Sequence, residues 1–161
     1  MIILKNNERL VNELIKRKWH IAFAESCTGG LCSSTIVDVA NASSVLNESI
    51  VTYANSAKIK YLNVSEATID KYNVVSEEVA YEMALGIKNT SNSEIGVGIT
   101  GAAGPTSDGI IPVGRVCFGF AILNRVYTKT IEFGEIGRNN VRKKACDFVY
   151  DFILEAIENE G

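Results

Sequence analysis

Histidine is almost missing from this sequence, because His20 is the only one among 161 residues. Zinc sites usually combine histidine and cysteine ligands at short spacings, and the scattered thiols of this chain do not supply that pattern. A serine–histidine–acid triad would have to use His20. That residue precedes the first predicted strand, at the end remote from the candidate nucleophile Ser26. We therefore expect no metal site and no histidine-dependent catalysis.

Closely spaced cysteine pairs are missing as well. The four cysteines form no CxxC motif, and all except Cys27 lie in apolar segments (Cys32, Cys117 and Cys146). Free cysteine is among the most buried residue types, and disulfides are rare outside oxidising compartments. We expect buried free thiols rather than disulfides.

The chain also lacks a strong excess of either charge, since its formal net charge is -3. It therefore offers no basic field for nucleic acid or for an anionic membrane surface, and any anionic ligand must be held locally. No apolar run approaches the roughly 20 residues of a membrane span. The N-terminus has no apolar core of a signal peptide, so the cytoplasm is the expected location.

The length favours one domain over residues 1–161. In the first two thirds, apolar periodicity predicts helices that alternate with short strands. The helices are expected near residues 7–18, capped by Asn6 or Asn7, and near 31–39 and 55–61, and the strands near 20–25, 49–54 and 95–100. Ser65 and Ser76 are N-cap candidates for further helices.

The last third has a different pattern. Residues 113–123 and 126–133 flank Asn124 and Arg125 as the strands of a hairpin. An apolar stripe from Val141 to Ile157 predicts a long final helix. Alternating helices and strands, followed by a hairpin and a helix, indicate an α/β sandwich with a mixed sheet.

The stretch Ala24-Glu25-Ser26-Cys27-Thr28-Gly29-Gly30 follows a short apolar run and precedes a segment that can be helical. It predicts a strand–turn–helix junction. Glycines at such a turn let the backbone approach a ligand, and free N–H groups at the start of the helix attract an oxyanion or phosphate. Ser26 would be an exposed hydroxyl among fixed donors. The alternative is a tight turn with an N-capping hydroxyl.

A second glycine loop, Gly101-Ala102-Ala103-Gly104-Pro105, follows the strand at 95–100 and continues to about Pro112. Ligands of open α/β sheets collect beyond the carboxyl ends of the strands. If the strands before the two loops are parallel neighbours, the loops face one pocket.

Ser26 needs a base, and the scarcity of histidine leaves the lysines. Lys58 is the best placed, one turn into the helix that follows the second strand. A lysine acts as a base only when burial or a nearby cation lowers its pKa toward neutrality. An exposed, solvated lysine is the alternative.

Other polar residues could line the same pocket. Thr100 could hold a substrate or only end a strand, and Tyr53 could pack in the core or donate through its phenol. Arg138 and Arg142 lie one helical turn apart at the start of the last helix, where cations are unfavourable for the helix dipole. This hints at a bound anion, although a solvated face is the alternative.

Taken together, these segments resemble the CinA C-terminal-domain family, whose characterised enzymes are nicotinamide-nucleotide amidases. The resemblance is carried, in the family's order and over nearly the whole chain, by 24–30, Tyr53-Ala54-Asn55-Ser56-Ala57-Lys58, Val75-Ser76-Glu77-Glu78-Val79-Ala80, Gly98-Ile99-Thr100-Gly101-Ala102-Ala103-Gly104-Pro105, Pro112-Val113-Gly114, and Arg138 with Arg142.

The resemblance implies a single-domain, three-layer α/β/α sandwich with a mixed sheet. It also implies hydrolysis of the carboxamide of nicotinamide mononucleotide to nicotinate mononucleotide and ammonia, without metal or cofactor. By matching position, Ser26 is the nucleophile and Lys58 its base. The implied substrate-binding residues are Tyr53, Thr28, Gly29, Gly30, Thr100, Gly101, Arg138 and Arg142, and of the two arginines Arg142 is assigned to the substrate.

The resemblance further implies a stand-alone form, with a small-molecule nucleotide as partner, and it is consistent with a homodimer. Two departures stand out: Cys32 and Ser33 replace larger aliphatic or alanine residues, and Thr106-Ser107-Asp108-Gly109 is less glycine-rich than the usual loop. The altered loop at residues 106–109 bears on substrate preference. Two rival hypotheses remain, a non-catalytic nucleotide-binding or regulatory module and an enzyme whose nucleophile is Cys27.

Overall fold

The computed structural model describes residues 4–160. Within them the chain forms six α-helices, a short 3₁₀ turn (η1) and five strands. Their bounds are α1 Asn6–Arg17, β1 Ile21–Glu25, α2 Leu31–Val37, η1 Ala42–Ser44, β2 Leu46–Val51, α3 Asn55–Leu62, α4 Glu66–Tyr72, α5 Glu77–Ser91, β3 Ile95–Gly101, β4 Arg115–Ile122, β5 Arg125–Glu132 and α6 Arg138–Glu158.

The strands form one mixed sheet in the order β2-β1-β3-β4-β5. Strand β1 pairs in parallel with both β2 and β3, whereas β3–β4 and β4–β5 are antiparallel. The predicted hairpin is therefore confirmed as β4–β5. Because β1 and β3 are parallel neighbours, the two glycine-containing loops leave the same edge of the sheet, as the sequence predicted.

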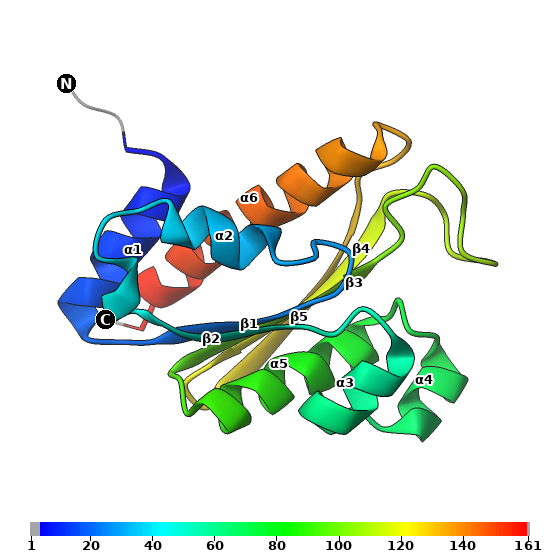
Figure 1. Ribbon diagram of the computed structural model, residues 1–161, viewed down its shortest axis with the longest axis horizontal. Helices are drawn as coiled ribbons and strands as arrows, with labels where there is room; N and C mark the ends of the chain where they lie inside the picture. The colour runs from blue at the N-terminus through cyan, green and yellow to red at the C-terminus, as the bar shows by residue number, and fades with distance from the viewer. Residues whose placement is uncertain (1–3, 161) are drawn as a thin grey trace.

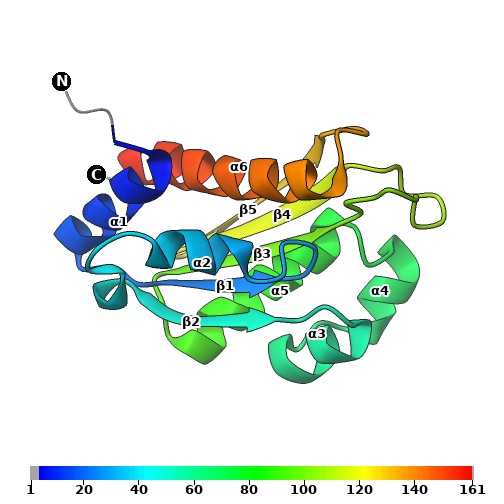
Figure 2. The same ribbon diagram turned by 45° about the horizontal axis from the view of Figure 1, so that its top comes forward.

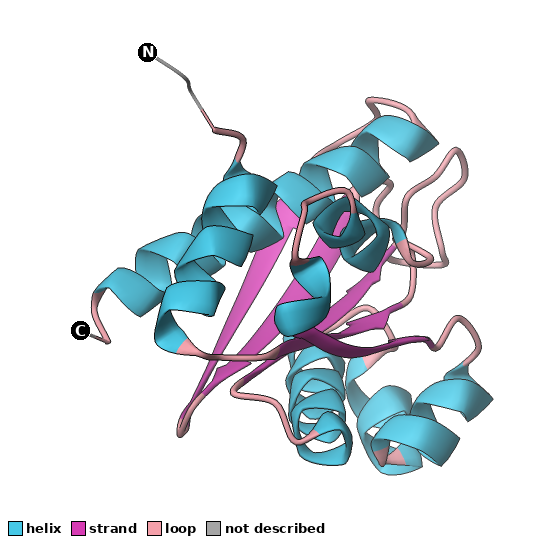
Figure 3. Ribbon diagram, turned by 60° about the vertical axis from the view of Figure 1, so that its left-hand side comes forward, coloured by secondary structure: helices cyan, strands magenta, loops and turns pink. Residues whose placement is uncertain are grey.

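Helices cover both faces of the sheet, which confirms the predicted three-layer sandwich. Helices α1, α2 and α6 lie on one face, and α3, α4 and α5 lie on the other (Figures 1 and 3). The larger core lies on the α1–α2–α6 face and includes Ile21 and Phe23 of β1. A smaller core on the opposite face joins Ala22 and Ala24 to α3 and α5.

Helix α5 lies directly against the backbone of the sheet because two paired glycines make room for it. Gly98 of β3 faces Gly119 of β4 in the register, and both lie against Ala80 of α5. A Cβ at Gly98 would stand 2.6 Å from the Ala80 carbonyl oxygen, a distance that real Cβ atoms do not adopt. The Ser76 hydroxyl accepts from the Val79 N–H at 3.2 Å, which confirms Ser76 as the N-cap.

Some predicted boundaries were wrong. Helix α1 begins at Asn6 after Lys5, so neither Asn6 nor Asn7 caps it. Helix α2 ends at Val37 rather than at 39. Strand β2 runs from Leu46 to Val51 rather than 49–54, because the chain leaves the ladder after residue 51 and turns two carbonyl groups toward Lys58. Within the described residues, no helix is long and apolar enough to cross a membrane.

Candidate active site

The two-residue period of β1 decides where Ser26 points. Ala22 and Ala24 face α3 and α5, whereas Ile21 and Phe23 face α2 and α6. Ser26 directly follows β1, and its N–H donates to the Ile99 carbonyl of β3 at 3.0 Å, so the ladder extends to it. The alternation therefore directs its hydroxyl to the face on which α3 lies.

Lys58 reaches Ser26 from α3. Its Nζ lies 3.1 Å from Ser26 Oγ and donates to the carbonyl oxygens of Thr52 at 2.7 Å and Tyr53 at 3.1 Å. The lysine is only 1% exposed, although most lysines are in water. The sequence prediction that Lys58 lies beside Ser26, rather than on a solvated face, agrees with this geometry.

Burial lowers the pKa of Lys58 from 10.5 to about 8, because the charged ammonium loses its hydration; the neighbouring Cys27 has the opposite, smaller effect. At pH 7 roughly a tenth of the molecules then carry a neutral amine. The thiol of Cys27 is different, since burial raises its pKa to about 12. Cys27 is thus a neutral thiol at pH 7, which disfavours it as the nucleophile.

A cavity of about 280 Å³ opens over Ser26 at the carboxyl edge of the sheet. One wall comes from the junction after β1 and from Tyr53, and the other from the loop after β3. Arg138, at the start of α6, closes the rim; Figure 2 shows the beginning of α6 and the loop after β3 at the same end of the sheet. The lining residues are Ser26, Cys27, Tyr53, Gly101, Ala102, Ala103, Gly104, Thr106, Ser107, Asp108 and Arg138.

Arg138 is held in place at this rim. Its Nη1 donates to the Gly104 carbonyl at 2.5 Å, and its Nη2 donates to the Tyr53 hydroxyl at 2.9 Å. The two bonds join α6, the loop after β3 and the segment after β2. Arg138 therefore presents a fixed positive charge at the mouth of the cavity.

Arg142, one turn further along α6, has a different position. Its Nε donates to the Cys27 carbonyl at 3.1 Å and its Nη2 to the Thr28 carbonyl at 2.9 Å. It is not among the residues that line the cavity. The geometry therefore places Arg142 behind the turn that carries Ser26, and the expected preference for Arg142 over Arg138 as the substrate's partner finds no support in it.

The start of α2 is not a free anion site, contrary to the sequence interpretation. The carboxylate of Glu25, fully buried, accepts from the N–H groups of Cys32 at 2.9 Å and Ser33 at 3.0 Å, and from the Ser33 hydroxyl at 2.8 Å. The chain's own anion thus occupies the N-terminus of the helix. Sequence reasoning gave Glu25 no role, because the contact depends on how the junction folds back.

Several other predicted substrate-binding residues also lie outside the cavity. Thr28 is fully buried, and Gly29 and Gly30 form the positive-φ part of the turn, with Gly29 against Arg142. The Thr100 hydroxyl donates to the Val74 carbonyl at 2.9 Å, so it ties the end of β3 to the segment before α5. Gly101 and Tyr53, in contrast, line the cavity as expected.

The residues that the sequence reading missed belong to the loop after β3. Thr106, Ser107 and Asp108 bring two hydroxyl groups and a carboxylate to the cavity wall. The departure of this loop from the glycine-rich pattern was the available signal, but residue type alone does not show that these three residues line the cavity.

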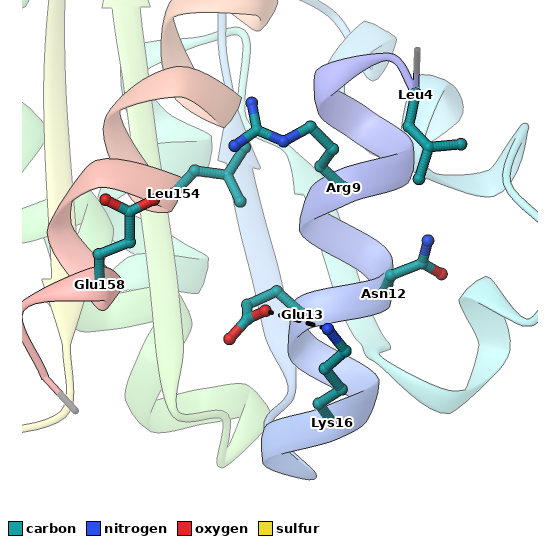
Figure 4. Close-up of a pocket in the computed structure, with 7 residues that line it drawn as sticks. All are labelled: Leu4, Arg9, Asn12, Glu13, Lys16, Leu154 and Glu158. Atoms are coloured by element: carbon teal, nitrogen blue, oxygen red, sulfur yellow. Dashed lines mark ion pairs between the residues drawn. The ribbon is translucent and has the colours of Figure 1, made fainter. Parts of the chain in front are cut away.

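The rest of the described structure offers no competing catalytic cluster. His20 lies before β1 and pairs with Glu94, 3.0 Å from Nδ1 to Oε1, at the opposite end of the strand from Ser26. No group of three or more potential metal ligands is found among residues 4–160. A hollow of about 480 Å³ between α1 and α6 is lined by Leu4, Asn12, Leu154 and four charged residues, among them the Lys16–Glu13 pair (Figure 4). Nothing in that hollow resembles an activated nucleophile.

The fold and the site together define a three-layer α/β domain with a buried serine–lysine pair at the carboxyl edge of its parallel strands. Residues 4–157 match the CinA C-terminal domain. The chain belongs to this family, which confirms the family resemblance seen in the sequence.

Solved structures of the same family are similar over nearly their whole length. A CinA superfamily protein from Escherichia coli is 30% identical, with a TM-score of 0.90 over 94% of this chain and 88% of that chain. One from Klebsiella pneumoniae is 28% identical, with a TM-score of 0.92 over 96% of each chain.

A CinA-like protein of Kosmotoga olearia is 44% identical over 151 residues, which are 93% of this chain and 36% of that protein. The chain therefore spans about a third of the length of this curated relative.

Proposed function

We propose that this chain is an amidohydrolase that converts nicotinamide mononucleotide and water to nicotinate mononucleotide and ammonia. The observation that carries the proposal is the 3.1 Å contact between Ser26 Oγ and a buried Lys58 Nζ, directly beneath a cavity. The resemblance of the family motifs to nicotinamide-nucleotide amidases supplies the substrate.

The surroundings of Lys58 suit a base that alternates between neutral and charged forms. The carbonyls of Thr52 and Tyr53 can only accept hydrogen bonds, so they take two of the amine's hydrogens in either form. The third tetrahedral direction of the nitrogen points to Ser26. In the neutral amine this direction holds the lone pair, and in the ammonium it holds a third N–H.

In the proposed reaction, neutral Lys58 takes the hydroxyl proton of Ser26 while the serine oxygen attacks the carboxamide carbon. The amide N–H of Cys27, adjacent to the nucleophile, is a candidate donor to the tetrahedral oxyanion. Such donors contribute about 10²–10³-fold to rate in comparable sites. The protonated lysine returns its proton to the departing ammonia, and water then hydrolyses the serine ester with Lys58 again as base.

Charge at the rim supports a nucleotide as the substrate. Arg138 is a fixed cation at the cavity mouth and matches the geometry of a phosphate. The carboxamide would lie at Ser26, deep in the cavity, and the phosphate would lie toward Arg138. In this arrangement Arg138, rather than Arg142, binds the substrate.

The second candidate is a nucleotide-binding or regulatory module that uses the same cavity without turnover. Ammonia release from nicotinamide mononucleotide by the purified chain, followed with a coupled glutamate dehydrogenase assay, separates the two. Differential scanning calorimetry with the same nucleotide runs in parallel. Ammonia and nicotinate mononucleotide in equal amounts support the amidase, whereas a ligand-dependent rise in Tm without product supports the binding module and contradicts the amidase.

A further inference from the structure

Two of the four buried thiols meet directly behind the candidate active site. Cys32 Sγ, in the first turn of α2, lies 2.8 Å from Cys146 Sγ of α6, and the two residues are 114 positions apart in the chain. Both are free and buried, at 0% and 3% exposure. The proposed amidase reaction uses neither thiol.

The contact belongs to one stripe of α6 that packs against the turn after β1. Arg142, Cys146 and Tyr150 follow one another at four-residue intervals, so they share a helix face. Arg142 holds the carbonyls of residues 27 and 28, and the Tyr150 hydroxyl donates to the Cys32 carbonyl at 2.7 Å. These bonds fix the backbone on both sides of the thiol pair and hold the two sulfur atoms together.

We propose that Cys32 and Cys146 are a dithiol site that a hydroperoxide oxidises to a disulfide, covalently joining α2 to α6. A disulfide bond is about 2.05 Å long, so the sulfur atoms need to approach by roughly 0.8 Å. Cys117 serves as an internal comparison, because it lies on β4 in a separate cluster. This inference does not depend on the proposed amidase activity.

The chemistry balances with one equivalent of hydroperoxide. One thiol attacks the terminal peroxide oxygen, which gives a sulfenic acid and, from hydrogen peroxide, water. The second thiol then attacks the sulfenic sulfur, the S–O bond breaks, and a second water leaves. Both sulfurs are oxidised and the peroxide is reduced. Because burial raises the pKa of the Cys32 thiol, little of Cys32 is present as thiolate, and we expect it to react slowly, through local opening.

The disulfide should stabilise the chain, since it closes a long loop in the unfolded state. For a domain of this size we expect Tm to rise by about 5–10 °C, and dithiothreitol should reverse the rise.

The test treats the full chain with a small excess of hydrogen peroxide, both in buffer and in guanidinium chloride below the unfolding midpoint. The reaction is quenched by alkylation in denaturant and followed by peptide mass mapping and thermal unfolding. We expect a linked peptide pair that contains Cys32 and Cys146, with the loss of two hydrogen atoms, and the reversible rise in Tm. Cys117→Ser should keep both results, whereas Cys32→Ser and Cys146→Ser should each lose both.

A different linked pair, sulfinic or sulfonic acids at unlinked cysteines, or the absence of a linked pair under both conditions overturns the proposal. If the serine variants fold poorly, the wild-type peptide map alone still decides which sulfur atoms join. An unchanged Tm despite a complete Cys32–Cys146 link would overturn the stabilising role.

Discussion

The amine of Lys58 lies 3.1 Å from the hydroxyl of Ser26, although the two residues are 32 positions apart and come from different elements. Two backbone carbonyls direct that amine, and burial lowers its pKa to about 8. Position, direction and proton affinity are thus set by the fold before a substrate binds. This is what a serine needs from a base in the absence of histidine.

The first prediction concerns the pH dependence of turnover. Because the proposed mechanism needs the neutral amine of Lys58, kcat/KM for nicotinamide mononucleotide should rise about tenfold per pH unit below pH 8 and level off above it, with an apparent pKa of about 8. Stopped-time ammonia assays from pH 6 to 10 measure this profile. A profile that is flat from about pH 6 to 8 would contradict the role of Lys58.

The second prediction concerns how the burial of Lys58 makes the unfolding free energy of the protein depend on pH. Its pKa falls from 10.5 in the unfolded chain to about 8 in the fold, so the unfolded chain binds more protons between these values. The cost of burying the charge is fully present below pH 8 and disappears as the pH rises to 10.5. The unfolding free energy of wild type should therefore increase by about 3 kcal/mol relative to Lys58→Met over this range.

Urea titrations of wild type and Lys58→Met at pH 7 and pH 10.5 measure this change in unfolding free energy. Subtracting the change seen in Lys58→Met removes the contribution of all other titrating groups. Lys60→Met, at an exposed position two residues further along α3, is the matched control and should show no such pH-dependent difference. The prediction is contradicted if the unfolding free energy of wild type changes between the two pH values by the same amount relative to Lys58→Met as relative to Lys60→Met. That result would mean that Lys58 keeps its charge when buried.

The third prediction separates the two arginines of α6. Arg142 holds the carbonyls of the turn that carries Ser26, so Arg142→Met should lower kcat by about 10–100-fold with little change in KM. Arg138 lines the rim, so Arg138→Met should raise KM by about tenfold and change kcat less. Steady-state kinetics on both variants tests the assignment. The reverse pattern would restore Arg142 as the substrate's partner.

The fourth prediction concerns Glu25. Replacing its carboxylate by an amide leaves one acceptor for the N–H groups of Cys32 and Ser33 and places an NH₂ group against donors. Glu25→Gln should therefore lower the unfolding free energy by about 2–4 kcal/mol. Ser33→Ala removes the hydroxyl bonds to Glu25 and to the Gly30 carbonyl but leaves both backbone N–H bonds to Glu25, and it should cost about 1 kcal/mol. Urea denaturation of both variants gives the comparison, and equal costs would contradict this role of the carboxylate.

The sequence predicted the main helices and strands, and it placed Ser26 and Lys58 in one candidate site. The reasons were largely local. Ser26 follows a short apolar strand and precedes two glycines, and Lys58 lies one turn into the next helix of the opposite layer. Strand and helix periodicity, together with the resemblance, were enough to place both side chains at one sheet edge. The parallel pairing of β1 and β3 then brought the second loop to the same cavity.

The details that were not predictable depend on contacts between distant segments. Arg138 and Arg142 are equivalent in the sequence, and only the packing of α6 against the turn separates a residue at the rim from one behind it. Glu25 and Ser26 are adjacent in the chain, but their side chains point to opposite faces of the sheet. Whether the carboxylate reaches the start of α2 depends on the path of the turn, which residue type does not specify.

The most direct measurement compares ammonia release from nicotinamide mononucleotide by wild type, Ser26→Ala and Cys27→Ser, with circular dichroism to confirm that each variant is folded. If Ser26 is the nucleophile, Ser26→Ala should lose at least about 10³-fold in kcat, whereas Cys27→Ser should stay within about tenfold of wild type. Activity that persists in Ser26→Ala and disappears in Cys27→Ser would contradict the serine–lysine mechanism.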